Sequence, residues 1–190
     1  YVYKRQTNIE GLIIIKPKKF KDSRGFFLES FQKKRYEKII GRYKFVQDNF
    51  SLSKRGVLRG LHYQETKPQG KLIRVSRGKV LDVAVDLRPH SSSFGKWTKA
   101  LLSEDNYLQF WIPPGFAHGF LSLTDNVHFE YKCTDYYDSK DEKTIIWNNN
   151  NWTSNQNFNV ENGKEYKIGT VSVLSDTTLG VNVVNSSLTR

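Results

Sequence analysis

The feature that most constrains the fold is a succession of short segments in which polar and apolar residues alternate, with turn residues between them. Residues 71–75 (KLIRV) and 79–87 (KVLDVAVDL) are the clearest, and a tight turn at Arg77-Gly78 separates them. A period of two places alternate side chains on opposite faces of a β-strand. Many short antiparallel strands joined by Gly, Pro and Asn turns predict a sandwich or a closed barrel. Further strand patterns lie at residues 11–16, 100–103, 108–112, 119–123 and 127–132.

One segment, residues 32–40, has a helical pattern, and little room is left for more helix. A chain of 190 residues is long enough for one domain, or for one domain with an appendage. The composition changes at Asn148, where the asparagine-rich stretch NNNNWTSNQNF begins, and strand patterns follow at 167–174 and 179–184. We therefore predict a barrel domain over residues 1–147. Residues 148–190 would form an atypical C-terminal extension, packed on the barrel or on a partner, or in part disordered.

Composition narrows the cellular context. No apolar run approaches the roughly 20 residues of a membrane-spanning helix, which predicts that no membrane is involved. The single cysteine, Cys133, has no internal disulfide partner and is typical of a reduced cytoplasmic protein. The net charge of +11 favours anionic partners. Because the basic residues are scattered and carry no nucleic-acid-binding motif, a small molecule with a diphosphate is a more economical partner than nucleic acid.

Residues 56–71 (GVLRGLHYQETKPQGK) place Arg59, His62 and Lys71 on one short segment. A single histidine in a strand is more often structural than catalytic. The two flanking cations change this balance, because nearby positive charge leaves the imidazole neutral and able to accept a proton near pH 7. Gly60 permits close approach of the backbone. His62 is therefore a candidate general base.

His118 lies in PPGFAHGF, where the spacing Pro113-x-Gly115-x-x-His118 matches the second half of the cupin double motif. A turn histidine with a structural role is the alternative. In metal-binding cupins an earlier HxH(x)₃₋₄E segment supplies the other ligands. Here that region reads GKVLDVAVDL, with Asp82 and Val83 and no histidine. The sequence therefore predicts that the site holds no metal.

Three phenols in EYKCTDYY, those of Tyr131, Tyr136 and Tyr137, are candidate proton donors, because a phenol has a pKa of about 10. Strand tyrosines are mostly core or interface residues, and we expect this of at least two of the three. Lys132 is expected on the opposite face of the strand from Tyr131. The chain has no Walker A, GxGxxG or GxSxG segment, which argues against phosphate-loop, dinucleotide and serine-hydrolase chemistry.

Two further pairs of polar residues have ordinary interpretations when they are taken alone. Arg24 and Glu29, in DSRGFFLESF, are suited to a surface salt bridge that contributes little stability. Gln47 and Asn49, in FVQDNF, suit the polar edge of a sheet.

Six segments, taken in order and spacing, resemble the dTDP-4-dehydrorhamnose 3,5-epimerase family from about Gly11 to Trp147. They are DSRGFFLESF, FVQDNFSLSKRGVLRGLHYQ, KPQGKLIRVSRGKVLDVAVDLR, FGKW, FWIPPGFAHGFL and YKCTDYY. The resemblance implies an all-β, cupin-type jelly-roll barrel with one or two short helices, a homodimer and no cofactor. It also implies an isomerase that epimerises a 4-keto-6-deoxy sugar on a nucleoside diphosphate, in deoxysugar and surface polysaccharide biosynthesis.

The resemblance also implies roles for single residues. His62 matches the general base, and Tyr131 matches the phenol that donates a proton from the opposite face of the sugar. Lys71 matches the lysine beside the sugar oxygen. The positions that match contacts to the nucleotide, the diphosphate or the sugar are Arg24, Glu29, Gln47, Asn49, Arg59, His118 and Glu142.

The C-terminal region departs from the family, which has an aspartate there that pairs with the catalytic histidine. Residues 173–180 (VLSDTTLG) keep Leu-Ser and an aspartate at altered spacing. Asp176 is the candidate for this orienting carboxylate. Asp82 or Asp86, on the strand next to the base, is the alternative.

The leading hypothesis is inversion of C3 and C5 of the sugar, converting dTDP-4-dehydro-6-deoxyglucose into dTDP-4-dehydrorhamnose. One alternative is an epimerase that inverts only C3 or only C5 of a related ketosugar nucleotide. Another is a non-catalytic sugar-binding jelly roll, which would not need His62, Lys71 and Tyr131 together.

The sequence also bears on the oligomeric state. The apolar strand at residues 11–16, which ends at a proline, suits pairing with another subunit's sheet edge and so favours a homodimer.

Overall fold

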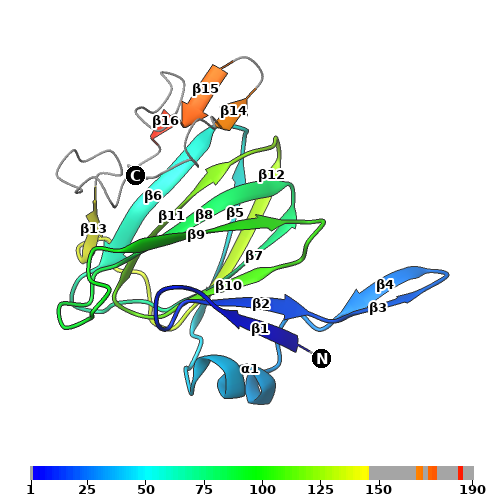
Figure 1. Cartoon of the computed structure of the whole chain (residues 1–190), viewed down its shortest axis with the longest axis horizontal. Helices are drawn as coiled ribbons and strands as arrows, with labels where there is room; N and C mark the ends of the chain where they lie inside the picture. The colour runs from blue at the N-terminus through cyan, green and yellow to red at the C-terminus, as the bar shows by residue number, and fades with distance from the viewer. Residues whose placement is uncertain (1, 146–165, 169–170, 175–183, 186–190) are drawn as a thin grey trace.

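The computed structural model describes residues 2–145 and the backbone of 166–168, 171–174 and 184–185, and its architecture is a barrel of two antiparallel sheets (Figure 1). The first sheet has the order β1 (Val2–Gln6), β2 (Ile13–Pro17), β10 (Gln109–Ile112), β7 (Lys71–Arg77), β12 (Val127–Cys133) and β5 (Gln47–Ser53). The second has the order β13 (Glu142–Thr144), β6 (Val57–Gln64), β11 (Phe116–Ser122), β8 (Lys79–Asp86) and β9 (Trp97–Ser103). The predicted all-β jelly roll is confirmed.

The inner faces of the two sheets form the main core. Phe120 of β11 and Phe129 of β12 stack across the barrel, with ring centroids 3.8 Å apart and planes at 14°. Both rings are buried, so this contact joins one sheet to the other. Around them lie the buried inward residues Ile73, Val75, Val80, Ala84, Phe110 and Ile112. The core therefore comes from the alternation that the sequence shows.

The turn at Arg77-Gly78 is present, and Gly78 has the positive φ of 79° that such a turn requires. The strands that it joins belong to different sheets, because β7 pairs with β10 and β12 whereas β8 pairs with β9 and β11. The chain thus crosses from one side of the barrel to the other at this turn.

Strand β2 is internal, which corrects one expectation. It pairs with β1 on one side and with β10 on the other, so both of its edges are occupied. The prediction that this strand pairs with another subunit's sheet edge is therefore wrong. Its apolar character has a different cause, because Ile14 faces the barrel core while Ile13 and Ile15 face a second cluster under the helix.

Helix α1 (Lys33–Ile40) confirms the predicted helix and covers the outer face of the first sheet. Gln32 caps its start by accepting a hydrogen bond from the backbone N–H of Arg35 at 2.7 Å. Tyr36 and Ile40 are buried against Ile13, Ile15 and Trp111, and the Tyr36 hydroxyl donates to Gln109 of β10 at 2.8 Å. Among the residues placed in the structure, no helix is long and apolar enough to cross a membrane.

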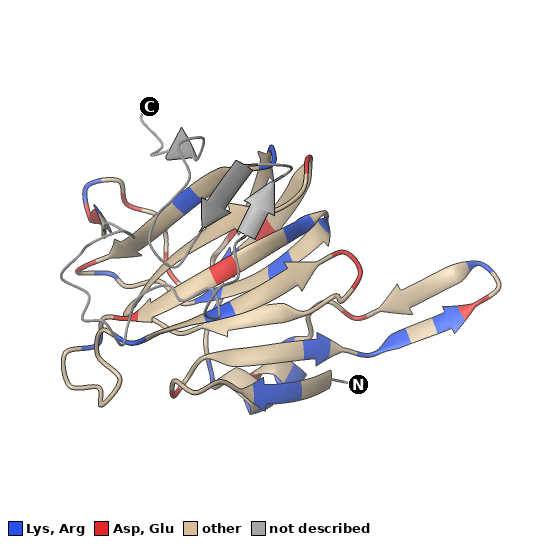
Figure 2. Ribbon diagram, turned by 45° about the horizontal axis from the view of Figure 1, so that its top comes forward, with Lys and Arg blue, Asp and Glu red and all other residues tan. Residues whose placement is uncertain are grey.

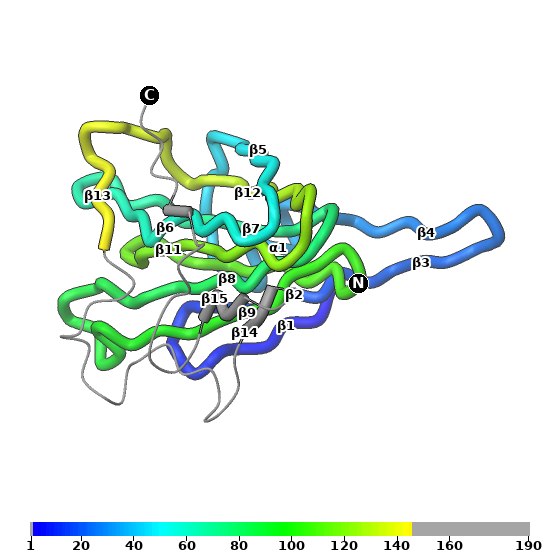
Figure 3. Tube along the Cα trace, turned by 90° about the horizontal axis from the view of Figure 1, so that it is seen from above, coloured from blue at the N-terminus to red at the C-terminus, as the bar shows by residue number. Residues whose placement is uncertain are grey.

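A hairpin of β3 (Lys19–Asp22) and β4 (Gly25–Leu28) projects away from the barrel (Figures 1 and 3). Two of its aromatic side chains are largely exposed, Phe26 at 47% and Phe27 at 67%. Figure 2 shows basic residues along β1, β2 and this hairpin. Aromatic rings are normally buried, and exposed rings such as those of this hairpin are typical of a surface that contacts another molecule.

The C-terminal region is described only in part. The predicted strand at 167–174 is two short strands, β14 (Tyr166–Ile168) and β15 (Val171–Leu174), which pair with each other. β16 (Val184–Asn185) pairs in parallel with β6. The proposed boundary at Asn148, and most of the strand predicted at 179–184, lie outside the described residues. The division into 1–147 and 148–190 stays a prediction.

Candidate active site

A cavity of about 950 Å³ opens in the barrel, between β5, β6, β7, β12 and β13. It brings together residues that are far apart in the sequence. Six of the predicted site residues line it, namely Gln47, Asn49, His62, Lys71, Tyr131 and Glu142.

Two glycines place His62 beside His118. Gly60 of β6 has a φ of 122°, and a Cβ atom on it would lie 2.5 Å from the Cα of Gly119 on β11. A Cβ on Gly119 would lie 2.7 Å from the carbonyl oxygen of Arg59. Only glycine permits this separation, which confirms the predicted close approach at Gly60. In the resulting register His62 is directly opposite His118.

The surroundings of His62 favour a neutral imidazole. Burial lowers its pKa, and the positive charges of Lys71 and Arg59 together with His118 lower it further. Glu142 acts in the opposite direction and raises the pKa. A neutral ring has a free nitrogen lone pair, so His62 is suited to accept a proton at neutral pH.

Lys71 begins β7 and lies directly opposite Cys133 of β12. Burial lowers the pKa of Lys71, while the nearby Cys133, Glu142 and Asp82 raise it. Burial also raises the pKa of Cys133, so this cysteine is a neutral thiol at physiological pH. When it is protonated, Lys71 places a cation in a partly dry site, where a cation stabilises a developing oxyanion most effectively.

Tyr131 faces the cavity from the middle of β12, and Lys132 points the other way to pair with Asp48 at 2.8 Å. The expected opposite orientation of these neighbours is confirmed. Burial raises the pKa of Tyr131 to about 12, with smaller contributions from Cys133 and Glu142. Its phenol is therefore protonated at every physiological pH and can donate a proton.

His118 and Arg59 are not among the residues that line the cavity. His118 is buried, and its Nε2 atom lies 3.0 and 3.1 Å from the two carboxylate oxygens of Asp82. The Nε atom of Arg59 donates to Ser53 at 3.1 Å. The buried Asp82 on the adjacent strand holds one edge of the His118 ring, and the expectation that His118 points into the cavity stays a prediction.

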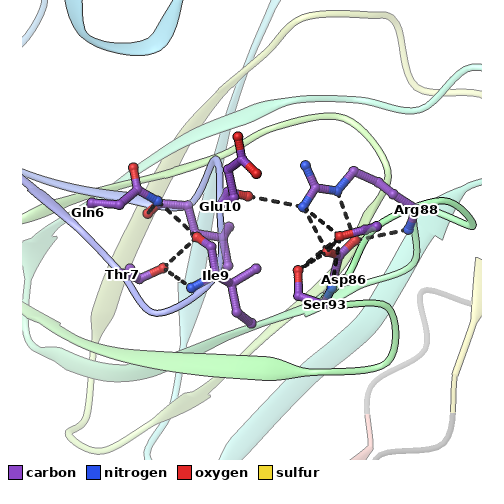
Figure 4. Close-up of polar contacts among 9 residues, drawn as sticks. Gln6, Thr7, Ile9, Glu10, Asp86, Arg88 and Ser93 are labelled. Carbon is purple, nitrogen blue, oxygen red and sulfur yellow. Dashed lines mark hydrogen bonds and ion pairs between the residues drawn. The ribbon is translucent and has the colours of Figure 1, made fainter.

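Neither alternative carboxylate orients His62. Asp82 is bound to His118, and Asp86 is bound to Arg88 through Nε at 2.9 Å and Nη2 at 2.7 Å (Figure 4). Arg88 also donates to the carbonyl of Glu10, so this pair ties the N-terminal turn to the end of β8. The idea that Asp82 or Asp86 substitutes as the orienting group is wrong for this reason. Asp176, the first candidate, lies outside the described residues.

Arg24 and Glu29 are not at the cavity of their own chain. Arg24 is at the tip of the β3–β4 hairpin, where its side chain is 88% exposed and pairs with Asp22 at 2.7 Å. Glu29 pairs with Arg35 at 3.4 Å. Each therefore forms a salt bridge, but with a different residue rather than with the other.

The loops around the cavity contribute lining residues that sequence reasoning missed. Gln64 organises these loops, because its amide nitrogen donates to the carbonyls of Lys67 and Tyr136 and its amide oxygen accepts from the N–H of Asp138. Nothing in the sequence pattern marks these loop positions, since their alignment depends on contacts between distant segments. The missed lining residues are Tyr63 and Gln64 at the end of β6 and the loop residues Lys67, Gln69, Asp135, Asp138 and Ser139, together with the noted phenols Tyr136 and Tyr137.

No group of three or more His, Cys, Asp or Glu side chains within the described part of the chain is arranged to hold a metal ion. The expected absence of a metal stays a prediction.

Comparisons with known proteins connect this geometry to a family. A family model described as dTDP-4-dehydrorhamnose 3,5-epimerase matches residues 6–168. A protein of that name from Escherichia coli strain K12 is 53% identical over 145 residues, covering 75% of this chain and 78% of that protein. The dTDP-6-deoxy-D-glucose-3,5-epimerase of Legionella pneumophila, solved in complex with dTDP-4-keto-L-rhamnose, is 55% identical with a TM-score of 0.74 and coverage of 76% and 78%. A Bacillus anthracis dTDP-4-dehydrorhamnose 3,5-epimerase, solved with TDP and PPi bound, is 40% identical with a TM-score of 0.78 and coverage of 80% and 89%.

Proposed function

The chain belongs to the dTDP-4-dehydrorhamnose 3,5-epimerase family, and we propose that it inverts C3 and C5 of a nucleotide-linked 4-keto-6-deoxy sugar. The reaction converts dTDP-4-dehydro-6-deoxyglucose into dTDP-4-dehydrorhamnose, a precursor for deoxysugars of surface polysaccharides. The observation that carries this proposal is that His62, Lys71 and Tyr131 line one cavity.

The chemistry follows from the ketone at C4. The C–H bonds at C3 and C5 are acidic, because removal of either proton leaves an enolate whose charge rests on the C4 oxygen. His62 accepts that proton, and Lys71 stabilises the oxyanion. Tyr131 then delivers a proton to the same carbon from the opposite face. One C–H bond breaks and another forms with inverted configuration, so the sugar is neither oxidised nor reduced.

The remaining lining residues hold the substrate. Gln47 and Asn49 of β5 present amide groups to the cavity, and the Gln47 side chain accepts from the backbone N–H of Tyr137 at 2.9 Å. These groups are suited to the sugar hydroxyls and the nucleotide, while Lys71 and the nearby Arg59 offset the negative charge of the diphosphate.

Deuterium exchange tests the proposal. The protein is incubated in D₂O with dTDP-4-dehydro-6-deoxyglucose, and NMR follows deuterium at C3 and C5 and the appearance of dTDP-4-dehydrorhamnose. We expect exchange and inversion at both carbons. Exchange confined to one carbon would identify a single-centre epimerase instead, and binding without exchange would identify a sugar-binding protein.

The exposed hairpin supports a homodimer. Arg24 and Glu29 match substrate-binding positions of the family, yet they lie away from the cavity of their own chain. In the dimer that we propose, the hairpin of one subunit reaches the cavity of the other, so that Arg24 contacts the substrate there and Phe26 and Phe27 become buried.

A cytoplasmic location is also part of the proposal, since Cys133 is a buried free thiol.

A further inference from the structure

His62 has an acidic neighbour on β13. Its Nδ1 atom lies 3.6 Å from Oε1 of Glu142, and both side chains are largely shielded, at 21% and 24% exposure. This separation is slightly longer than a hydrogen bond and within the range of an ion pair. Among the residues that the structure describes, Glu142 is the ion-pair partner of His62.

The register of β13 determines where the carboxylate lies. β13 pairs antiparallel with β6, so that Thr144 is opposite His62 and Glu142 is opposite Gln64. Residues two apart on a strand share a face, which makes Glu142 the diagonal neighbour of His62 on the cavity side. A side chain as long as glutamate spans that diagonal.

The strand itself is firmly attached. Asp141 accepts hydrogen bonds from the backbone N–H groups of Thr66 and Lys67 at 2.9 Å each and from the Thr66 hydroxyl at 2.8 Å. The N–H of Glu65 donates to the carbonyl of Asp141 at 3.3 Å. These contacts hold β13 against the loop that follows β6, so the approach of Glu142 to His62 is built into the fold.

We propose that Glu142 is the positioning carboxylate of His62. It accepts the Nδ1 proton, which selects the tautomer whose Nε2 atom is bare and available as the base. It also stabilises the imidazolium that forms when the sugar C–H proton is taken up. The kinetic consequence of this role rests on the proposed epimerase function, whereas the effect of Glu142 on the His62 imidazole does not.

The second oxygen of Glu142 explains why this role is preferred to substrate binding. Oε2 accepts a hydrogen bond from the Tyr137 hydroxyl at 2.8 Å. With one oxygen held by Tyr137 and the other directed at His62, both oxygens have protein partners. This orientation is what a positioning group needs, because it aims the carboxylate at the ring.

The charged groups around His62 make the test specific. Arg59 from β6, Lys71 from β7 and His118 from β11 all lower its pKa, and Glu142 from β13 raises it. Loss of the Glu142 charge therefore moves the pKa of His62 downward. The proton at Nδ1 also loses its acceptor, so the tautomer preference weakens.

The experiment is an NMR titration of the full chain carrying ¹⁵N-labelled histidine rings. The chain has four histidines, and His62→Gln identifies the signal of interest. In the unaltered protein we expect the neutral His62 ring to carry its proton on Nδ1. In Glu142→Gln we expect a titration midpoint at lower pH and a mixture of tautomers, with partial recovery in Glu142→Asp.

Two matched variants complete the design. Lys143→Gln changes a charge on the same strand, at the position opposite Tyr63 rather than His62, and should leave the His62 signals unchanged. Asp176→Asn removes the carboxylate that sequence reasoning favours. If Asp176→Asn shifts the His62 midpoint and Glu142→Gln does not, the proposal is overturned. An Nε2 proton in the unaltered protein overturns it as well.

Kinetics supply a second readout. In Glu142→Gln we expect the deuterium-exchange rate at saturating substrate to fall about 10- to 100-fold, as for metal-site histidines that lose an orienting partner. The acid limb of its pH profile should move to lower pH, with KM little changed. A raised KM with an unchanged rate would assign Glu142 to substrate binding. Absence of exchange in the unaltered protein would refute the epimerase function, and the NMR titration would still decide the role of Glu142.

Discussion

His62 and His118 lie directly opposite each other on β6 and β11, yet only His62 lines the cavity. The two rings differ in their carboxylate partners. Asp82 binds His118 at 3.0 Å inside the barrel, whereas Glu142 approaches His62 at the cavity wall. Two histidines in adjacent positions therefore have different surroundings, and of the two only His62, the candidate base, is among the residues that line the cavity.

Replacement of His62 should remove the base. In His62→Ala we expect both deuterium exchange and epimerisation to fall by at least about 10²–10⁴-fold, because enolate formation begins each event. Exchange followed by NMR and product followed by chromatography measure the two effects. His90→Ala, which alters an exposed loop histidine, is the matched control and should behave like the unaltered protein. Normal turnover by His62→Ala would refute the mechanism.

Tyr131→Phe should separate proton removal from proton delivery. His62 still takes and returns the proton on one face, so exchange continues with retention of configuration. Inversion should slow by about 10²–10⁴-fold, because the phenol that protonates the other face is gone. Tyr3→Phe, at a largely exposed tyrosine on β1, is the control. Equal loss of exchange and inversion would show that the two roles are not divided in this way.

The pH dependence of exchange should reflect the lowered pKa of His62. The base works when it is neutral, so the rate rises as pH increases through this pKa and the acid limb lies below about 6.5, the usual imidazole value. Tyr131, with a pKa of about 12, contributes no loss of activity between neutral pH and pH 10. Rate measurements from pH 4 to 10 test both statements, and an acid limb above 7 would contradict the first.

Mixed subunits test whether the hairpin serves the neighbouring cavity. In a dimer of Arg24→Ala with His62→Ala, the cavity that keeps His62 receives an intact Arg24 from the other subunit. After unfolding and refolding an equal mixture, we expect about a quarter of all sites to be active, although each variant alone is impaired. If Arg24 acted within its own chain, mixing would restore nothing. Light scattering on the unaltered protein checks the dimer directly.

The pair of buried Asp86 and partly exposed Arg88 should contribute to stability without affecting catalysis. The Arg88 guanidinium, Ser91 and Ser93 all bind Asp86 and hold its pKa below the usual range despite burial. Arg88→Met leaves a buried carboxylate without its cation and should lower the free energy of unfolding by about 3–5 kcal/mol. Activity per folded molecule should be unchanged.

A surface pair provides the control for this stability change. Lys132→Met breaks the contact with Asp48, which is 69% exposed, and should cost less than about 1 kcal/mol. Urea unfolding measures the stability change of both variants.

Because the folded pKa of Asp86 is depressed, the contribution of Asp86 to stability is present above its unfolded pKa of about 3.9 and is lost as the pH falls through the folded value. Arg88→Met should show a weaker loss of stability in acid. Equal costs for the two variants would contradict this account.

The sequence alone determined the helix, many of the strands and the family. Alternation at residues 71–75 and 79–87 predicted strands, because a β-strand exposes alternate side chains to opposite faces. The helical pattern at 32–40 became α1. The motifs GVLRGLHYQ, KPQGK and EYKCTDYY identified His62, Lys71 and Tyr131 as candidates, because a short segment of local sequence carries each one.

Only the tertiary structure decided which neighbours these residues have. The apolar strand at 11–16 suggested a sheet edge, but packing against α1 and the core gave β2 two partners. Asp82 and Asp86 lie on β8, which β11 separates from β6, and they pair with His118 and Arg88, while a diagonal contact brought Glu142 to His62. Spacing along the chain predicts local conformation, whereas the partner of a buried charge depends on strand order and register, which are properties of the folded barrel.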